Sequence, residues 1–192
     1  MFTVLFTSIG RRVELAQAFK NSYLNHGIFA RVFGTDSDPS LAPAGHFVDD
    51  VFQVPRVCES GYVKALLQIC RKQTVKLLIP LYEPEFLILD QHREEFKKIG
   101  TIILLSATDA LKICADKLET YGFFNKHDIN TPNTWPIGEQ PSNTGFPLFV
   151  KPRSGMGSAG VYKITSQSEL DFLANRNPEL IVQEYISGTE YT

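Results

Sequence analysis

The chain has 192 residues, a length that suits one large domain or two small ones. It is 43% hydrophobic and 21% charged, which supplies enough apolar side chains for a packed core. The formal net charge of −2 excludes the strongly basic surface with which proteins bind nucleic acids or anionic membranes, so we expect neither partner.

The cysteines and histidines show no spacing typical of a metal site. None of the three cysteines forms a CxxC pair, and the four histidines are scattered. An odd number of cysteines is typical of reduced thiols, so we expect a cytoplasmic protein. We find no apolar run long enough to span a bilayer and no secretory signal.

The first half of the chain alternates predicted strands with predicted helices. Apolar runs predict strands at 2–7, 29–34, 51–54, 75–80 and 101–105. Helical spacing predicts helices from 13 to a stop at Gly27, at 62–72 and at 84–98. This alternation is typical of a parallel, doubly wound sheet, and we take residues 1–106 as the first domain.

The second half, residues 107–192, predicts a smaller α+β domain. Serine caps at Ser106 and Ser166 open helices that reach 114 and 173, and another helix is expected at 116–127. Strands are expected near Trp135 and at 149–151, 161–165 and 180–186, with one more beginning at Glu190. Since the chain stops in the middle of this pattern, we expect it to be a fragment of a longer protein.

A glycine-rich loop between two predicted strands carries the strongest chemical signal. Lys151 is the last residue of an apolar predicted strand, and the loop 154–160, which consists mostly of small residues, follows shortly after it. Small residues allow the backbone to approach a ligand, and successive backbone N–H groups can bind an anion. The pattern predicts a polyphosphate cradle on a β-hairpin, although an ordinary mobile hairpin tip would have the same residues.

Strand, lysine, glycine-rich loop and strand, followed by Gln183-Glu184-Tyr185-Ile186, resemble the nucleotide-binding half of the ATP-grasp superfamily. This superfamily includes carbamoyl-phosphate synthase large subunits, biotin carboxylases and related carboxylate–amine ligases. The loop lacks GxxxxGK[ST] and is therefore not a Walker P-loop. The resemblance implies a Rossmann-like preATP-grasp parallel sheet, followed by the N-terminal lobe of an ATP-grasp domain and truncated before its C-terminal lobe.

The resemblance also implies roles for individual residues. Lys151 would bind the α- and β-phosphates of ATP, and Lys117, in an Asp-Lys pair at a helix start, would reach the phosphates from the other side. The adenine would lie against the hinge at Glu184, and Glu190 would hold the ribose hydroxyls. The full set of implied ATP-binding residues is Lys117, Lys151, Ser154, Gly155, Gly157, Ser158, Glu184, Tyr185, Ile186 and Glu190. Each lysine or acid could instead be an ordinary solvated residue.

The N-terminal turn after the first strand carries a weaker signal. It has Gly10 without the other glycines of GxGxxG, which disfavours NAD binding although Asp36 ends the second strand as a ribose-binding acid would. The resemblance places the acceptor substrate at the strand ends, and Gly10, Arg11 and Glu83 are the candidates to border that substrate cleft. Arg11 is equally compatible with a solvated helix residue. Glu83 and its neighbour Glu85 are equally compatible with ordinary acids in a first helical turn.

The resemblance implies an ATP-dependent ligase that activates a carboxylate or bicarbonate as an acyl phosphate for attack by an amine, releasing ADP and phosphate. The ligands for Mg²⁺ are expected beyond residue 192, so no metal ligand and no catalytic residue is assigned, and the chain alone is expected to be inactive. One alternative is a nucleotide-binding regulatory or split subunit, and another is an NAD-binding α/β domain. The substrates are expected to be small molecules; the acceptor and the oligomeric state stay open, with a homodimer as one alternative.

Overall fold

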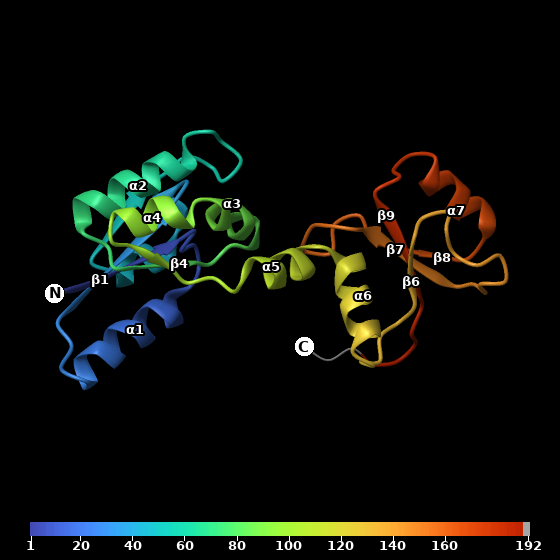
Figure 1. Cartoon of the computed structure of the whole chain (residues 1–192), viewed down its shortest axis with the longest axis horizontal. Coiled ribbons are helices and arrows are strands. Elements are labelled where there is room, and N and C mark those ends of the chain that lie inside the picture. Colours follow the sequence, from blue (N-terminus) through green and yellow to red (C-terminus); the bar gives the residue numbers. More distant parts are fainter. Residues whose placement is uncertain (190–192) are drawn as a thin grey trace. The chain divides into compact units, whose positions relative to one another are not determined.

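Two sheets of different kinds form two separate units in the computed structural model, which describes residues 1–189 (Figure 1). The first unit is Met1–Thr108, and the second begins at Asp109. The expected strand start and ribose-binding role at Glu190 lie outside the described residues. In the part of the chain that is described, no helix is long and apolar enough to cross a membrane.

The first unit contains a five-stranded parallel sheet in the order β3-β2-β1-β4-β5. The order runs outward from β1 in both directions, so the chain reverses its winding between β1 and β4. Open α/β sheets place ligands at the carboxyl ends of the strands at such a point. The strands are β1 (Phe2–Thr7), β2 (Ala30–Asp36), β3 (Asp50–Gln53), β4 (Leu77–Pro80) and β5 (Ile102–Ile103).

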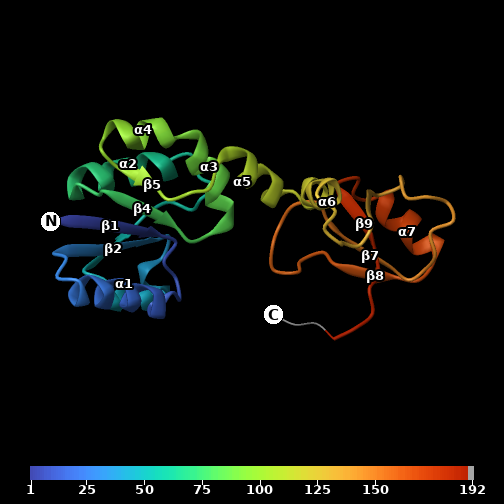
Figure 2. The same ribbon diagram turned by 60° about the horizontal axis from the view of Figure 1, so that its bottom comes forward.

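Helices cover both faces of this sheet (Figure 2). On one face Phe6 of β1 packs with Ala16 of α1, and on the other Leu5 packs with Leu66 and Phe96 of α2 and α4. Burial of both faces explains why the strands are apolar at successive positions. The helices are α1 (Val13–Asn25), α2 (Tyr62–Gln73), α3 (Phe86–Gln91) and α4 (Arg93–Lys98), with 3₁₀ turns η1 (Pro39–Leu41), η2 (Pro43–Phe47) and η3 (Glu83–Glu85).

The single helix predicted at 84–98 is wrong, because the segment divides into η3, α3 and α4 with a break at His92. The His92 carbonyl accepts from two amides of the next turn. The Arg93 guanidinium binds Asp90 on one side of the break and the carbonyls of Leu105 and Ser106. These contacts with a later segment exist only in the folded chain, so helical spacing does not show the break.

Other predicted bounds shift by a few residues. The strand predicted at 101–105 keeps only Ile102–Ile103, since it lies at the sheet edge and pairs with β4 alone. The strand predicted at 29–34 continues to Asp36, because β3 pairs with its last residues. Helix α5 (Thr108–Ala115) begins later than a cap at Ser106 requires.

The second unit contains an antiparallel sheet in the order β6-β9-β7-β8. Helix α6 contacts β6. The serine cap expected at Ser166 is present, since its hydroxyl accepts from the Glu169 amide that opens α7. The elements are α6 (Lys117–Lys126), β6 (Thr134–Pro136), β7 (Leu148–Pro152), β8 (Tyr162–Ile164), α7 (Gln167–Ala174) and β9 (Leu180–Glu184).

The two faces of the second sheet have different characters. Leu148 and Val150 of β7 and Val182 of β9 are buried in a core with Leu170 of α7. Side chains alternate along a strand, so the intervening residues of β7 and β9 belong to the other face. That face carries Phe149, Lys151 and Gln183, all partly exposed. The sheet therefore uses one face for this core, while its other face combines the buried Ile181 with the polar side chains of Lys151 and Gln183.

Candidate nucleotide site

The glycine-rich loop joins β7 to β8, which pair as the predicted hairpin. Gly155, Gly157 and Gly160 have φ angles of +111°, +70° and +70°. A side chain at Gly155 or Gly157 would meet nothing within 4 Å, so glycine is needed there for backbone conformation and not for space. Ser158 adopts φ of +56°, which is uncommon for a residue with a side chain. The loop therefore holds a backbone shape that few other sequences adopt.

Arg153, the residue directly before the loop, is fixed to the start of α6. Asp116 caps this helix by accepting from the Leu118 amide at 2.9 Å. The other carboxylate oxygen of Asp116 accepts from Arg153 Nε at 2.6 Å, and the Lys117 amide donates to the Arg153 carbonyl at 3.0 Å. This network joins two segments 37 residues apart and brings Lys117 to the loop.

Lys117 and Lys151 present two positive charges that are bound only to neutral oxygens. Lys117 Nζ donates to the Gly155 carbonyl at 2.9 Å, and Lys151 Nζ donates to Gln183 Oε1 at 2.9 Å. Within residues 1–189, neither ammonium group has a carboxylate within 4.0 Å. Burial, and then the charge of Lys117, lower the pKa of Lys151. A bound anion would relieve this repulsion, so the arrangement suits a polyphosphate.

Glu184, the last residue of β9, is held by the segment before β6. Asn133 donates to its carboxylate twice, from the backbone amide and from Nδ2, both at 2.9 Å. The Asn133 side chain, and then its backbone amide, lower the pKa of Glu184. The next residues, Tyr185 and Ile186, are exposed, and Lys163 Nζ lies 4.1 Å from the centroid of the Tyr185 ring. The carboxylate is thus fixed in place, with exposed residues directly after it.

Sequence reasoning did not identify Asn133, Gln183 or Lys163 as members of this site. Asn133 lies in a segment rich in turn-forming residues, and nothing in its spacing points to Glu184. The alternation of β9 was a usable signal for Gln183, because it places this residue on the face opposite Val182. Of the predicted residues, Ser154 and Ser158 are exposed and lie on the loop.

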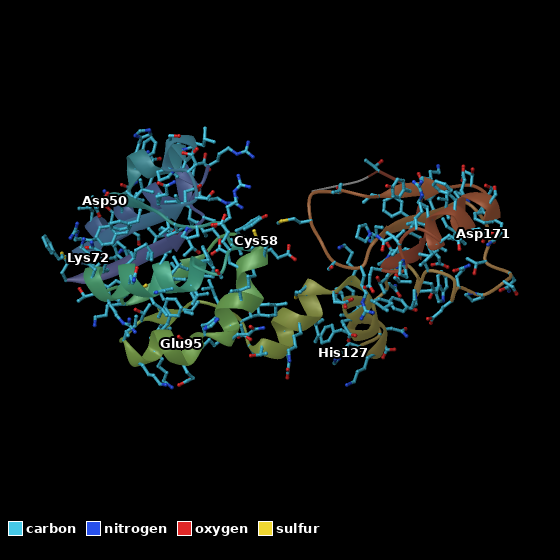
Figure 3. All side chains as sticks on the ribbon, turned by 90° about the horizontal axis from the view of Figure 1, so that it is seen from above. Asp50, Cys58, Lys72, Glu95, His127 and Asp171 are labelled. Atoms are coloured by element: carbon cyan, nitrogen blue, oxygen red, sulfur yellow. The ribbon has the colours of Figure 1, made fainter. Side chains whose placement is uncertain are left out.

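A separate crevice of about 600 Å³ lies in the first unit, at the carboxyl ends of its parallel strands. Gly10, Arg11 and Glu83 are not among the residues that line it, although their neighbours Ser8 and Tyr82 are. The Gly10 amide donates to Asp36 at 3.1 Å, which fixes the turn after β1. Charged, polar and apolar groups share the lining, and Cys58, which also lines it, is labelled in Figure 3. The lining includes Ser8, Asp36, Ser37, Arg56, Tyr62 and Tyr82.

Glu85 lies beneath these strand ends and is fully buried. Thr7 and Tyr62 both donate hydroxyl hydrogen bonds to its Oε2, the Tyr62 hydroxyl at 2.7 Å. Burial raises the pKa of the Glu85 carboxyl, and burial together with the neighbouring Glu85 raises the pKa of Tyr62. Glu85 is therefore neither an exposed acid of a first helical turn nor a group on the cleft surface.

No metal centre accompanies these groups. Over residues 1–189, no three His, Cys, Asp or Glu side chains lie together as the ligands of a metal ion would. Mg²⁺ is usually bound through one or two carboxylates together with substrate phosphates.

Two family models together match most of the chain. The model for a PylC-like N-terminal domain matches residues 4–104, more than half of the chain, and the model for an ATP-grasp domain matches residues 114–192. The chain belongs to the ATP-grasp superfamily, with a PylC-like N-terminal domain. The predicted α/β fold, a parallel sheet followed by a smaller α+β unit, is confirmed.

Curated relatives agree with this assignment. A carbamoyl-phosphate synthase from Methanobrevibacter smithii is 24% identical over 149 residues, which are 74% of this chain and 39% of the relative. The vancomycin/teicoplanin A-type resistance protein VanA from Enterococcus faecium is 31% identical over 86 residues, which are 41% of this chain and 25% of the relative. The chain thus spans less than half the length of either relative.

Solved structures share the fold. An L-amino acid ligase from Bacillus licheniformis has a TM-score of 0.65 at 16% identity, and the match covers 98% of this chain and 45% of the ligase chain. The biotin carboxylase domain of the Hydrogenobacter thermophilus 2-oxoglutarate carboxylase, solved with MgADP, ADP and bicarbonate, has a TM-score of 0.73 at 13% identity. The match covers 97% of this chain and 45% of the biotin carboxylase chain.

Proposed function

We propose that this chain is the ATP-binding portion of an ATP-grasp ligase. The observation that carries the proposal is the pair of ammonium groups on Lys117 and Lys151, which lie beside the glycine-rich loop and bind only neutral oxygens. The two positive charges are not compensated by a nearby carboxylate, and a bound polyphosphate would compensate them. Membership of the ATP-grasp superfamily supports ATP as the ligand.

The proposed contacts follow the geometry of the second unit. Lys151 and Lys117 bind the phosphates, and the loop closes over them with the backbone of Gly155 and Gly157 and the hydroxyls of Ser154 and Ser158. The adenine lies at the hinge, where the fixed carboxylate of Glu184 accepts from its amino group. The backbones of Tyr185 and Ile186 bind the adenine edge, and Glu190 is proposed for the ribose hydroxyls.

The proposed reaction is carboxylate activation. A carboxylate or bicarbonate oxygen attacks the γ-phosphorus of ATP, the bond to the bridging oxygen breaks, and ADP leaves with that electron pair. An amine nitrogen then attacks the acyl carbon, loses a proton, and displaces phosphate. The likeness to an L-amino acid ligase, and to a biotin carboxylase domain solved with MgADP and bicarbonate, supports this class of reaction.

We propose that the acceptor substrate lies at the strand ends of the first unit, near Gly10, Arg11 and Glu83, and that it is a small molecule. The crevice there contains both Asp36 and Arg56 and is large enough for one. Mg²⁺ would enter with the nucleotide. Because residues 1–189 hold no acidic cluster for it, we propose that residues 1–192 alone bind ATP without turning it over.

The test of ATP binding is calorimetric titration of the full-length protein with Mg·ATP. We expect Lys151→Ala to weaken binding about 100-fold, the loss expected when a hydrogen bond between charged groups of ~2–3 kcal/mol is removed. Lys126→Ala is the matched control, because Lys126 is an exposed lysine at the other end of α6, and its affinity should stay within about twofold of the wild type. An unchanged affinity in Lys151→Ala would defeat the site assignment.

A second assay separates a ligase from a protein that only binds nucleotide. The full-length protein is incubated with Mg·ATP and a panel of carboxylates and amines, and phosphate release is measured. Release that requires both a carboxylate and an amine supports the ligase. Tight ATP binding without release on any pair favours a nucleotide-binding regulatory subunit, and metal-dependent release from residues 1–192 alone contradicts the proposed inactivity of that stretch.

A further inference from the structure

A chain of hydrogen bonds crosses the polar face of the second sheet and ends at Lys151. Thr134 Oγ1 donates to the Pro132 carbonyl at 3.0 Å. Gln183 Nε2 donates to Thr134 Oγ1 at 2.8 Å, and Lys151 Nζ donates to Gln183 Oε1 at 2.9 Å. Three neighbouring strands, β6, β9 and β7, therefore take part in placing one ammonium group.

Strand register makes these contacts direct. Thr134 lies opposite Gln183, and Gln183 lies opposite Phe149, two residues from Lys151 on the same face of β7. Diagonal neighbours in an antiparallel sheet are within reach of long side chains. The Lys151 ammonium lies 5.8 Å from the centroid of the Phe149 ring, which shows that the side chain is directed back along the sheet toward Gln183.

The hydrogen bond from Thr134 to the Pro132 carbonyl determines the direction of the other two hydrogen bonds in this series. A carbonyl only accepts, so the hydroxyl proton of Thr134 is used on Pro132. The hydroxyl oxygen then accepts, which requires the NH₂ end of the Gln183 amide to face Thr134. The oxygen end must face Lys151, which has only donors. Thr134 is almost fully buried, with 2% of its surface exposed, so its hydroxyl has little access to water as an alternative partner.

We propose that Gln183 is a positioning residue for Lys151 and that Thr134 sets the orientation of its amide. The inference rests on the proposed function, in which Lys151 binds phosphate. A neutral amide fixes the ammonium on the sheet face and leaves its charge uncompensated for the ligand. A carboxylate at the same position would hold the lysine equally well but would neutralise it and repel the phosphates.

The test compares four variants of the full-length protein by Mg·ATP titration across pH. Gln183→Met keeps the length of the side chain and removes the acceptor, so affinity should fall about tenfold, the effect of losing one hydrogen bond to a charged group. Gln183→Glu should also bind ATP more weakly at neutral pH. Thr134→Val removes the acceptor for the amide and should weaken binding several-fold, whereas Thr134→Ser should restore it to within about twofold of wild type.

A positioning role also predicts shifts that a merely structural role would not produce. The alkaline limb of ATP binding, where Lys151 loses its proton, should move to lower pH in Gln183→Met and to higher pH in Gln183→Glu. NMR titration of ¹³C-labelled lysine side chains without nucleotide should give the same two shifts. Fluorescence of Trp135, the one tryptophan of the chain, reports whether each variant keeps the second unit folded.

The outcomes separate this inference from the proposed function. If Lys151→Ala abolishes tight binding while Gln183→Met changes neither the affinity nor the alkaline limb, Gln183 does not position Lys151. If Lys151→Ala itself has no effect, the proposed phosphate site is wrong. If the Gln183 variants do not fold, the contrast between Thr134→Val and Thr134→Ser decides, and equal affinities of these two overturn the inference.

Discussion

The two units place ionisable groups in opposite situations. In the first unit, Glu85 is fully buried; its Oε2 accepts from the hydroxyls of Thr7 and Tyr62, while its Oε1 has no hydrogen-bond partner among the described residues. In the second, Lys117 and Lys151 lie at or near the surface and have only neutral acceptors. A buried group whose hydrogen bonds are made within the chain contributes to the fold, whereas close like charges without a counter-charge cost stability until a ligand arrives. The first arrangement is structural and the second is suited to binding.

Removal of both lysines should give the largest effect and tests this contrast directly. The double variant Lys117→Ala/Lys151→Ala should weaken Mg·ATP binding more than about 100-fold, because two charged contacts are lost. Its melting temperature, followed by Trp135 fluorescence, should equal or exceed that of the wild type, since the repulsion between the lysines is gone. If the double variant has a lower melting temperature than the wild type, Lys117 and Lys151 stabilise the fold. That result would contradict the contrast with Glu85.

Glu85→Ala should have the opposite profile. The change leaves two buried hydroxyls without an acceptor and opens a cavity, so the first unit should lose about 3 kcal/mol of unfolding free energy. Hydrogen exchange of the β1 amides measures this loss. Glu83→Ala is the control, because Glu83 is exposed and two residues away, and its effect should be below about 0.5 kcal/mol. If Glu85→Ala lowers the unfolding free energy less than Glu83→Ala does, Glu85 does not stabilise the first unit.

Asp116 combines a structural role with a role at the candidate site, because it caps α6 and also holds Arg153, the residue directly before the loop. Asp116→Ala should lower the stability of the second unit by about 1–2 kcal/mol through the lost cap. Asp171→Ala on α7 (Figure 3) is the control, since Asp171 is exposed and its carboxylate accepts from Gln167 of the same helix. Thermal melts followed by Trp135 fluorescence compare the two, and equal melting temperatures would mean that the Asp116 network has no net effect.

The smallest effect concerns pH. The pKa of Glu85 is higher in the folded protein than its ordinary value of 4.5, so the unfolded chain loses this proton first as pH rises. The stability of the first unit should therefore fall from pH 4.5 upward until pH passes the raised pKa of the folded state. Glu85→Gln should flatten this dependence and be relatively more stable at neutral pH. Parallel pH profiles of the two proteins, measured by hydrogen exchange of β1, would contradict the assignment.

The sequence predicted the strands well where burial determines the residue pattern. The segment Phe2–Thr7 is apolar because both faces of β1 are covered, and its predicted bounds are those of the structure. The lysine and glycines of the hairpin were also predictable, since strand–loop–strand is a local pattern. The start of α6 was predicted to within one residue, but the role of Asp116 as its N-cap was not predicted.

Contacts between distant segments were not predictable. Asn133 and Glu184 are 51 residues apart, and each would be compatible with solvent when considered alone. The burial of Glu85 depends on Tyr62 and Thr7, which only the folded sheet brings near an acid that resembles a helix-start residue. Likewise, the break at His92 depends on carbonyls that arrive later in the chain.

The alternation of β7 and β9 links correct folding to a working site. A slip of one residue between the two strands would exchange their faces, bringing Val182 into solvent and Gln183 into the core. Such a misfolded form would lose the buried position of Val182 and the partner of Lys151 in the same step. The pairing that buries Val182 is therefore the same pairing that places Gln183 beside Lys151.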